Sequence, residues 1–278
     1  MRVSALVARG TARLGSAAEA RTLAAHALRI DPRQLLLASE ADPETVTSFD
    51  ALVAQRETGV PVQHLTGRAW FRTVEVTVGP GVFVPRPETE VMVGWALDRL
   101  AELSHPPRVV ELCAGSGAIS LSIATEFPEA QIHAVEISDA AVRYLRTNLE
   151  GTHVEVVPGD MAEACTQLDG QVDLVIANPP YVPLEHWAGL PADVRDHDPL
   201  EALVSGADGL DAIRVVASAG RRLVRPGGWI CAEHAEVQAD SAPEVFIREG
   251  AFTEIHDQCD LTGRPRFVTA RRAGRIGA

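Results

Sequence analysis

The residues best suited to chemistry are four in a row, Asn178, Pro179, Pro180 and Tyr181, which follow a short apolar run. The two prolines cannot donate backbone hydrogen bonds and hold φ at about −65°, so the turn is stiff. The Asn178 side-chain carbonyl and the Pro179 backbone carbonyl are then two acceptors in a fixed relation, and they match the two N–H donors of a planar NH₂ group. Tyr181 adds a flat face for stacking. The pattern therefore predicts a site for a carboxamide or an aromatic amine.

Such a nitrogen is a poor nucleophile because its lone pair is delocalised. Holding both hydrogens toward fixed acceptors aims the lone pair at an electrophilic carbon, and a dry, acceptor-lined site favours the positive charge that develops on nitrogen. No strong general base is needed before transfer, because the proton can leave afterwards. We therefore assign the catalytic and substrate-binding roles to Asn178, Pro179, Pro180 and Tyr181.

A glycine loop precedes this motif in the chain. Gly115 and Gly117 lie between an apolar run at 108–112 and a helical pattern that begins at Ala118. Glycine lets a backbone approach a ligand closely, and a helix N-terminus adds N–H donors. A dinucleotide loop would have a third glycine where this chain has Ser120. The chain also contains no lysine, which excludes Walker-type phosphate loops and Schiff-base chemistry.

Acidic residues stand at the ends of three successive predicted strands. Glu111 suits an ammonium group, directly or through water, and Glu136 is placed to accept two ribose hydroxyls. Asp160 and Met161 can meet the edge and the face of adenine. These groups match S-adenosylmethionine (SAM), a cationic methyl donor, and no metal is expected. The predicted cofactor-binding residues are Glu111, Cys113, Ala114, Gly115, Ser116, Gly117, Glu136, Asp160, Met161 and Asn178.

The elements that position these residues alternate between strand and helix from Arg108 onward. Strands are predicted at 108–112, 131–137, 153–157, 172–177, 229–233, 252–257 and 267–270. Apolar strands separated by helices imply a mostly parallel sheet with helices on both faces. The last two strands have no room for a helix between them, so they should pair antiparallel. The predicted fold is α/β, with a doubly wound, mostly parallel seven-stranded sheet.

The first part of the chain differs in character. Ala, Leu and Val recur at helical spacing, and Asp31-Pro32 and Asp42-Pro43 are typical of helix starts. We predict a small N-terminal helical bundle at 1–66, a linking β-hairpin at 67–88 and a SAM-dependent methyltransferase domain at 89–278.

The composition of the chain bears on whether it binds nucleic acid or a membrane. The 25 basic and 38 acidic side chains give a net charge of −13, which disfavours binding to DNA or RNA through counterion release. The basic stretch from Arg264 to Arg275 is interpreted as a terminal strand and its end. No apolar run approaches the ~18 residues of a membrane helix, and residues 1–30 carry Arg and Glu throughout, so we expect a cytoplasmic protein. None of the four cysteines forms a C-x-x-C pair.

With the run Asn178 to Tyr181 after the fourth strand, the chain resembles class I SAM-dependent amino-methyltransferases. It is most similar to the HemK/PrmC family of release factor glutamine N5-methyltransferases. Further matching segments are 61–67, 83–90, which reads Phe-Val-Pro-Arg-Pro-Glu-Thr-Glu, 198–203 and 260–264.

The resemblance implies the substrate, namely the glutamine of the Gly-Gly-Gln motif in class 1 peptide chain release factors, and thus a role in translation termination. It also implies that the N-terminal bundle helps to dock that protein. The chain departs from the family at four positions: Gly is usual at Cys113, Asp is frequent at Glu111 and Glu136, and an aromatic residue is frequent at Met161.

Two other functions fit part of the pattern. A DNA or RNA amino-methyltransferase acting on adenine N6 or cytosine N4 faces the same chemistry, but it must flip a base and hold phosphates, and no basic surface for this is evident. A non-catalytic SAM-fold binding subunit usually loses the glycine loop or the substrate loop, and both are intact here. A nicotinamide dehydrogenase is disfavoured by Ser120.

Overall fold

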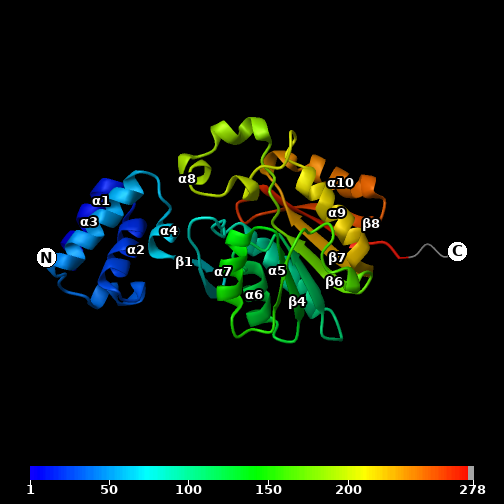
Figure 1. Cartoon of the computed structure of the whole chain (residues 1–278), viewed down its shortest axis with the longest axis horizontal. Helices are drawn as coiled ribbons and strands as arrows, with labels where there is room; N and C mark the ends of the chain where they lie inside the picture. Colours follow the sequence, from blue (N-terminus) through cyan, green and yellow to red (C-terminus); the bar gives the residue numbers. More distant parts are fainter. Residues whose placement is uncertain (275–278) are drawn as a thin grey trace. The chain divides into compact units, whose positions relative to one another are not determined.

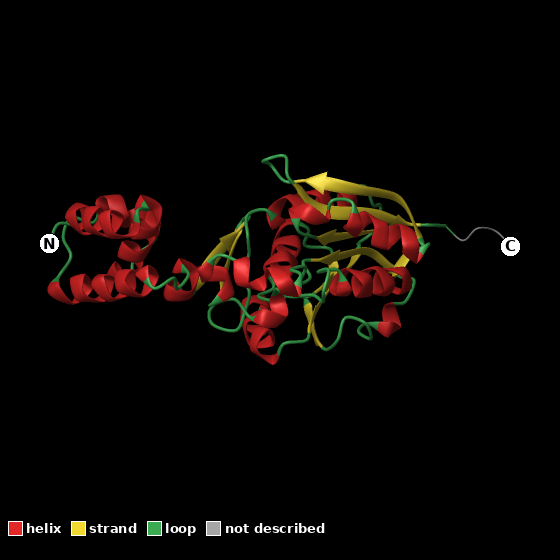
Figure 2. Cartoon of the chain, turned by 90° about the horizontal axis from the view of Figure 1, so that it is seen from above, coloured by secondary structure: helices red, strands yellow, loops and turns green. Residues whose placement is uncertain are grey.

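The computed structural model describes residues 1–274 and divides into two compact units. The first unit holds Met1–Arg68, Val78–Pro80 and Pro191–His197. The second holds Ala69–Thr77, Gly81–Leu190 and the chain from Asp198 onward. Figure 2 shows helices in the N-terminal part and the yellow strands in the rest. The three-part division into bundle, hairpin and methyltransferase domain stays a prediction.

The first unit is built from short helices around an apolar core. They are α1 (Val3–Leu14), α2 (Ala17–Leu28), η1 (Pro32–Leu37), α3 (Pro43–Glu57) and α4 (Val62–Thr66). Phe49 is fully buried, and Gly10 leaves room for its ring, because a Cβ there would lie 2.5 Å from Phe49 Cζ. The Asp42 side chain accepts the Thr45 N–H at 2.7 Å and so caps α3 as its sequence predicts. Asp31 caps η1, a 3₁₀ helix, in the same way.

The second unit contains a seven-stranded sheet in the order β5-β4-β3-β6-β7-β9-β8. Its strands are β3 (Arg108–Leu112), β4 (Gln131–Glu136), β5 (Glu155–Pro158), β6 (Val172–Ala177), β7 (Val224–Glu233), β8 (Phe252–Cys259) and β9 (Pro265–Arg272). The first five are parallel, whereas β9 pairs antiparallel with β7 and β8. The predicted doubly wound, mostly parallel sheet and its antiparallel last pair are therefore confirmed.

Helices cover both faces of this sheet. They are α5 (Thr89–Ala101), α6 (Ala118–Glu126), α7 (Asp139–Leu149), α9 (Asp211–Leu223) and α10 (Ser241–Glu249). Val135 packs in the large core under α9 and α10, which lie side by side in Figure 1. Its neighbour Ala134 packs in a separate cluster with Leu145 and Leu149 of α7. Successive residues of a strand point to opposite faces, so these clusters mark the two sides.

The structure differs from the sequence prediction mainly at strand ends. Strand β7 begins at Val224, five residues before the predicted start at 229. Pro226, Gly227 and Gly228 are typical of a turn, which hid this part of the strand. Val224 pairs with Val172 of β6 and Trp229 pairs with Leu174, so a bulge at the four intervening residues of β7 interrupts the pairing.

Two connections outside the sheet carry short elements of their own. A hairpin of β1 (Arg68–Phe71) and β2 (Val74–Thr77) precedes α5. The long segment after Tyr181 contains three short helices, η3 (Leu184–Gly189), α8 (Ala192–Arg195) and η4 (Leu200–Ala202). Two further 3₁₀ turns are η2 (Thr166–Leu168) and η5 (Glu236–Gln238).

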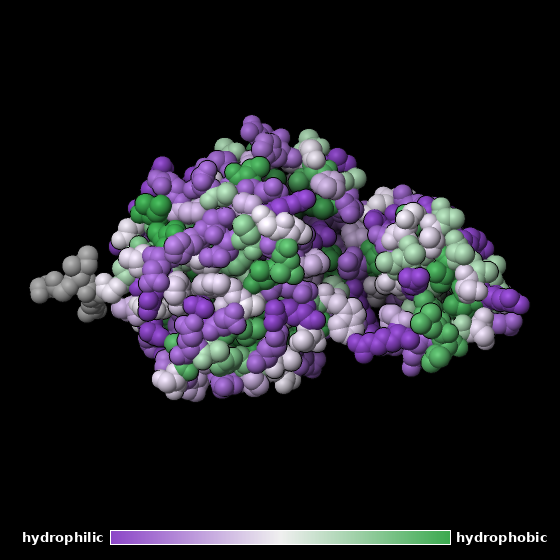
Figure 3. Space-filling view, turned by 180° about the vertical axis from the view of Figure 1, so that it is seen from behind, coloured by the Kyte–Doolittle hydropathy of each residue, from purple (hydrophilic) through white to green (hydrophobic). Residues whose placement is uncertain are grey.

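The surface is mostly polar. On the face in Figure 3, hydrophilic residues predominate and apolar ones form small separate groups. No helix within residues 1–274 is long and apolar enough to cross a bilayer. Most of the basic stretch from Arg264 lies on β9, while Arg275 lies outside the described residues.

Candidate active site

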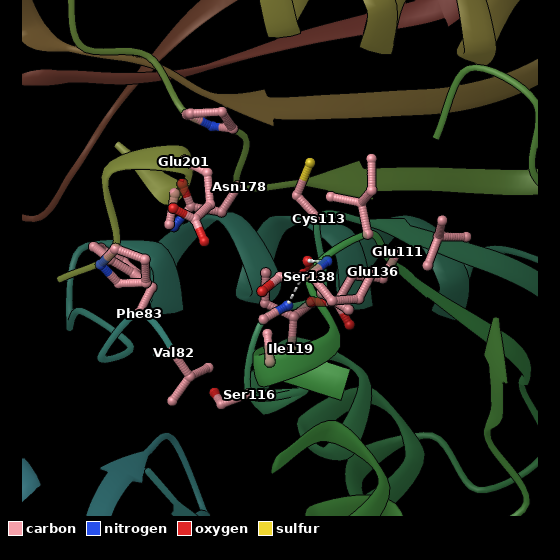
Figure 4. Close-up of a pocket in the computed structure, with 18 of the residues that line it drawn as sticks. Val82, Phe83, Glu111, Cys113, Ser116, Ile119, Glu136, Ser138, Asn178 and Glu201 are labelled. Atoms are coloured by element: carbon pink, nitrogen blue, oxygen red, sulfur yellow. Dashed lines mark hydrogen bonds between the residues drawn. The ribbon is translucent and has the colours of Figure 1, made fainter. Parts of the chain in front are cut away.

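A cavity lies at the carboxyl ends of β3, β4 and β6, entirely within the second unit, and collects most of the predicted site residues (Figure 4). Parallel α/β sheets bind their ligands at this edge. The predicted residues that line it are Glu111, Cys113, Ala114, Gly115, Ser116, Glu136, Asp160, Met161, Asn178, Pro180 and Tyr181. Gly117 and Pro179 are not in the cavity wall; Gly117 caps α6, and Pro179 is buried.

The glycine loop takes left-handed backbone angles at three alternate positions. Cys113, Gly115 and Gly117 have φ of 60°, 55° and 81°. A Cβ on Gly115 would meet no atom within 4 Å, so this residue presents open backbone to the cavity. A Cβ on Gly117 would lie 2.6 Å from Leu145 Cδ1, so this glycine serves the packing of α6 against α7. Glycine is therefore required at these two positions for different physical reasons: access to the cavity at Gly115 and helix packing at Gly117.

Glu136 is tied to the loop that surrounds it. One carboxylate oxygen accepts the Gly115 N–H at 2.7 Å, and the other accepts the Ser138 N–H at 2.8 Å (Figure 4). Each carboxylate oxygen has two lone pairs, so both keep one for a ligand. The side chain thus orders the glycine loop while it faces the cavity.

Glu111 is the most deeply buried acid of the cavity. Its exposed fraction is 1%, and its Oε2 atom accepts both the backbone N–H and the hydroxyl of Ser120. Burial raises the pKa of Glu111 to about 8, against which the Ser120 hydrogen bonds act. In the sequence analysis, Ser120 served only as evidence against a dinucleotide-binding loop. In the structure it is the hydrogen-bond partner of Glu111.

Cys113 and Met161 lie against each other. The Cys113 Sγ atom is 3.5 Å from Met161 Sδ, and Met161 also packs against the core under α9 and α10. A non-glycine residue at a φ of 60° is strained, which gives a physical reason for the glycine that the resembling family usually carries at Cys113. Burial raises the pKa of the Cys113 thiol well above its usual value.

The cavity wall is rich in carboxyl groups. Its wall includes the carboxyl groups of Glu111, Glu136, Asp160 and Glu201, and among the described residues that line it there is no Arg or His. Nor do residues 1–274 contain a cluster of three metal-ligating side chains. A wall of this kind suits a cation and opposes a phosphate.

Asn178 lies at the other end of the cavity from Glu111, near Phe83 and Glu201 (Figure 4). Its Nδ2 atom donates to Thr89 Oγ1 at 3.3 Å. The Thr89 hydroxyl in turn donates to Glu233 Oε2 at 2.6 Å, and the Tyr181 hydroxyl donates to Glu233 Oε1 at 3.3 Å. Burial raises the pKa of Glu233 to about 7. Sequence reasoning named Asn178 and Tyr181 but missed both groups that hold them.

Another part of the wall comes from chain segments on either side of the motifs. Val82 and Phe83 precede α5, and Glu201 and Leu203 follow η3 and α8. Arg86 connects the two segments through a 2.7 Å ion pair with Asp198, a buried carboxylate. Both segments belong to stretches that carried the family resemblance, and that resemblance was the only signal in the sequence that could have found them.

Family models match two regions of the chain. Residues 5–67 match the PrmC N-terminal domain, and residues 75–187 match the Methyltransferase small domain. A protein named release factor glutamine methyltransferase from Streptomyces coelicolor is 46% identical over 278 residues, which cover 96% of this chain and 97% of that protein. Its namesake from Mycolicibacterium smegmatis is 44% identical, covering 92% and 91%.

The chain is also similar to a methyltransferase with a different name and to a solved methyltransferase structure. A 4-amino-L-phenylalanine/4-methylamino-L-phenylalanine methyltransferase from Streptomyces pristinaespiralis is 38% identical, covering 85% of this chain and 81% of that protein. Among solved structures, a methyltransferase from Pyrococcus furiosus has a TM-score of 0.53 at 15% identity, covering 80% of this chain and all of that one. At this sequence identity, the structural match supports the fold alone.

Proposed function

Because the chain belongs to the family of release factor glutamine methyltransferases, we propose that it transfers a methyl group from SAM to the side-chain amide nitrogen (N5) of the glutamine in the Gly-Gly-Gln motif of class 1 peptide chain release factors. These matches confirm the family, the methyltransferase fold and the SAM cofactor that the sequence predicted. One observation supports the site most directly: an acid-lined cavity without basic side chains among its described residues ends at Asn178.

The residues present fit SAM. The open backbone at Gly115 leaves room for a ligand in close contact, and the free lone pairs of Glu136 suit a pair of hydroxyls. The Asp160 carboxyl group suits an adenine amino group. Glu111, whose pKa burial raises to about 8, suits the ammonium of the amino-acid end because a cation beside it lowers that pKa and favours the carboxylate. When bound, SAM supplies a methyl carbon made electrophilic by a cationic sulfur.

The chain's own residues then act on the substrate amide. Asn178 Oδ1 accepts one N–H group, which directs the nitrogen lone pair along the cavity. The backbone carbonyl of Pro179, a residue outside the cavity wall, stays the predicted acceptor for the second N–H group. The Tyr181 ring packs on the plane of the amide. With SAM bound, the nitrogen electron pair would form the new N–C bond to the methyl group that SAM supplies, the S–C bonding electrons would stay on sulfur, and one N–H proton would leave to water. Orientation and acceptor dipoles carry the catalysis.

The decisive experiment measures transfer of a labelled methyl group from SAM to a recombinant class 1 release factor. We expect label on the wild-type factor and none on a factor whose Gly-Gly-Gln glutamine is replaced by alanine. Double-stranded DNA and free 4-amino-L-phenylalanine are parallel acceptors, the second chosen because a relative is named for it. Label on DNA or on the free amino acid, with none on the release factor, would overturn the proposal.

The helical first unit carries the family's N-terminal model, and we propose that it helps to dock the release factor. Its role is tested with the full-length chain. Substituting the exposed Leu36 and Leu37 with serine should raise KM for the release factor and leave SAM affinity unchanged. An unchanged KM would remove this surface from the docking site.

A further inference from the structure

A chain of hydrogen bonds runs from Asn178 through Thr89, which also belongs to the cavity wall, to Glu233, which does not. It passes from Asn178 Nδ2 to Thr89 Oγ1 and from Thr89 to Glu233 Oε2. Thr89 and Glu233 have exposed fractions of 2% and 1%, so water does not compete for these bonds. Asn178 follows β6, Thr89 begins α5 and Glu233 ends β7. The edge-to-face packing of Trp95 on Trp229, with ring centroids 5.5 Å apart, fixes α5 against β7.

The direction of the chain follows from hydrogen-bond chemistry. An ionised carboxylate can only accept, so the hydroxyls of Thr89 and Tyr181 must both donate to Glu233. The single proton of Thr89 is then used, and the hydroxyl can offer only lone pairs to Asn178. Asn178 must therefore face Thr89 with its NH₂ group and turn its carbonyl oxygen toward the cavity.

Packing alone does not make this choice, because the oxygen and the NH₂ group of an asparagine amide have almost the same size. The chemistry depends on it. A substrate NH₂ group needs an acceptor, and an Asn178 turned the other way would present a donor to a donor. We propose that Thr89 and Glu233 are positioning residues that set the orientation of the Asn178 amide and so make it an acceptor for the substrate nitrogen. This inference rests on the proposed amide methylation.

The protonation of Glu233 gives the inference a second consequence. The charged and titratable groups that act on it are Arg266, Glu88 and the Tyr181 hydroxyl. Burial dominates and raises the pKa of Glu233 to about 7. A protonated Glu233 can donate to Thr89, which frees the Thr89 proton to donate to Asn178, and the amide can then turn. Methyl transfer should therefore fall as the pH drops through about 7.

The first test compares two substitutions of Thr89 in the full-length enzyme. Thr89→Val keeps the shape and removes the hydroxyl, whereas Thr89→Ser keeps the hydroxyl. T89V leaves no hydroxyl to select one orientation of the Asn178 amide. We expect it to lower kcat by about two- to tenfold, the change that corresponds to one buried hydrogen bond, and T89S to recover most of the loss. The dissociation constant for SAM, measured by calorimetry, should match the wild type in both, which separates orientation from folding.

The second test is the pH profile of kcat/KM between pH 6 and 9. The wild type should lose activity below about pH 7, and Glu233→Gln, which cannot ionise, should lack this acid limb. A T89V enzyme with wild-type kcat, or an E233Q enzyme with an unchanged acid limb, would overturn the positioning role. A wild-type enzyme that methylates no release factor would instead overturn the proposed function, so the two failures are distinct.

Discussion

The two glycines of the cofactor loop should fail in different ways when each is changed to alanine. Gly117→Ala places a methyl group 2.6 Å from Leu145 Cδ1 at a φ of 81°. The left-handed backbone costs an alanine roughly 1–2 kcal/mol, and overpacking against α7 adds about 1–3 kcal/mol. Gly115→Ala has a φ of 55° and meets no atom within 4 Å, so only the backbone cost applies.

The assays are thermal unfolding and SAM calorimetry on both variants. A loss of 1 kcal/mol lowers Tm by about 2–4 °C in a protein of similar size, so G117A should melt about 4–20 °C below the wild type and G115A about 2–8 °C below it. G115A, however, fills the space that the ligand occupies and should raise the SAM dissociation constant by about tenfold or more. Equal losses of Tm, or wild-type SAM binding by G115A, would refute the separate roles assigned to the two glycines.

Three further outcomes are expected. Asn178→Ala should abolish methyl transfer, measured with labelled SAM, and leave SAM affinity largely intact; normal turnover would remove its assigned role. Glu136→Ala should weaken SAM binding by about tenfold or more, because it loses the ligand's acceptor and the carboxylate that orders Gly115; unchanged calorimetry would contradict this. The raised pKa of Glu111 means that its contribution to stability is full below about pH 4.5 and lost as the pH rises to about 8. Glu111→Gln keeps the acceptor for Ser120 and should flatten the decline of Tm over this range, and an identical decline in the variant would show that another group causes it.

Local pattern was sufficient for much of the fold. Strands β3 and β6 have the predicted bounds and α6 begins at the predicted Ala118, because apolar runs, helical spacing and glycine turns act within a few residues. The start of β7 was wrong because Val224, ahead of the turn-like Pro226 and Gly227, also pairs with β6, and an unpaired bulge joins the two paired parts. Pairing between strands is not a local property of either one.

The sequence by itself determined which residues reach the ligand edge of the sheet, since the carboxyl end of a strand carries its next residues there whatever the rest of the chain does. Glu136, Gly115 and Asn178 could be named on that ground. Only the tertiary structure decided how these groups are held. Thr89 lies 89 residues from Asn178 and 144 from Glu233 along the chain, so their contact depends on the packing of α5 against the sheet. A short sequence pattern shows which side chains follow the end of a strand. The direction of a buried hydrogen bond depends instead on residues that are distant in the sequence and meet only in the folded core.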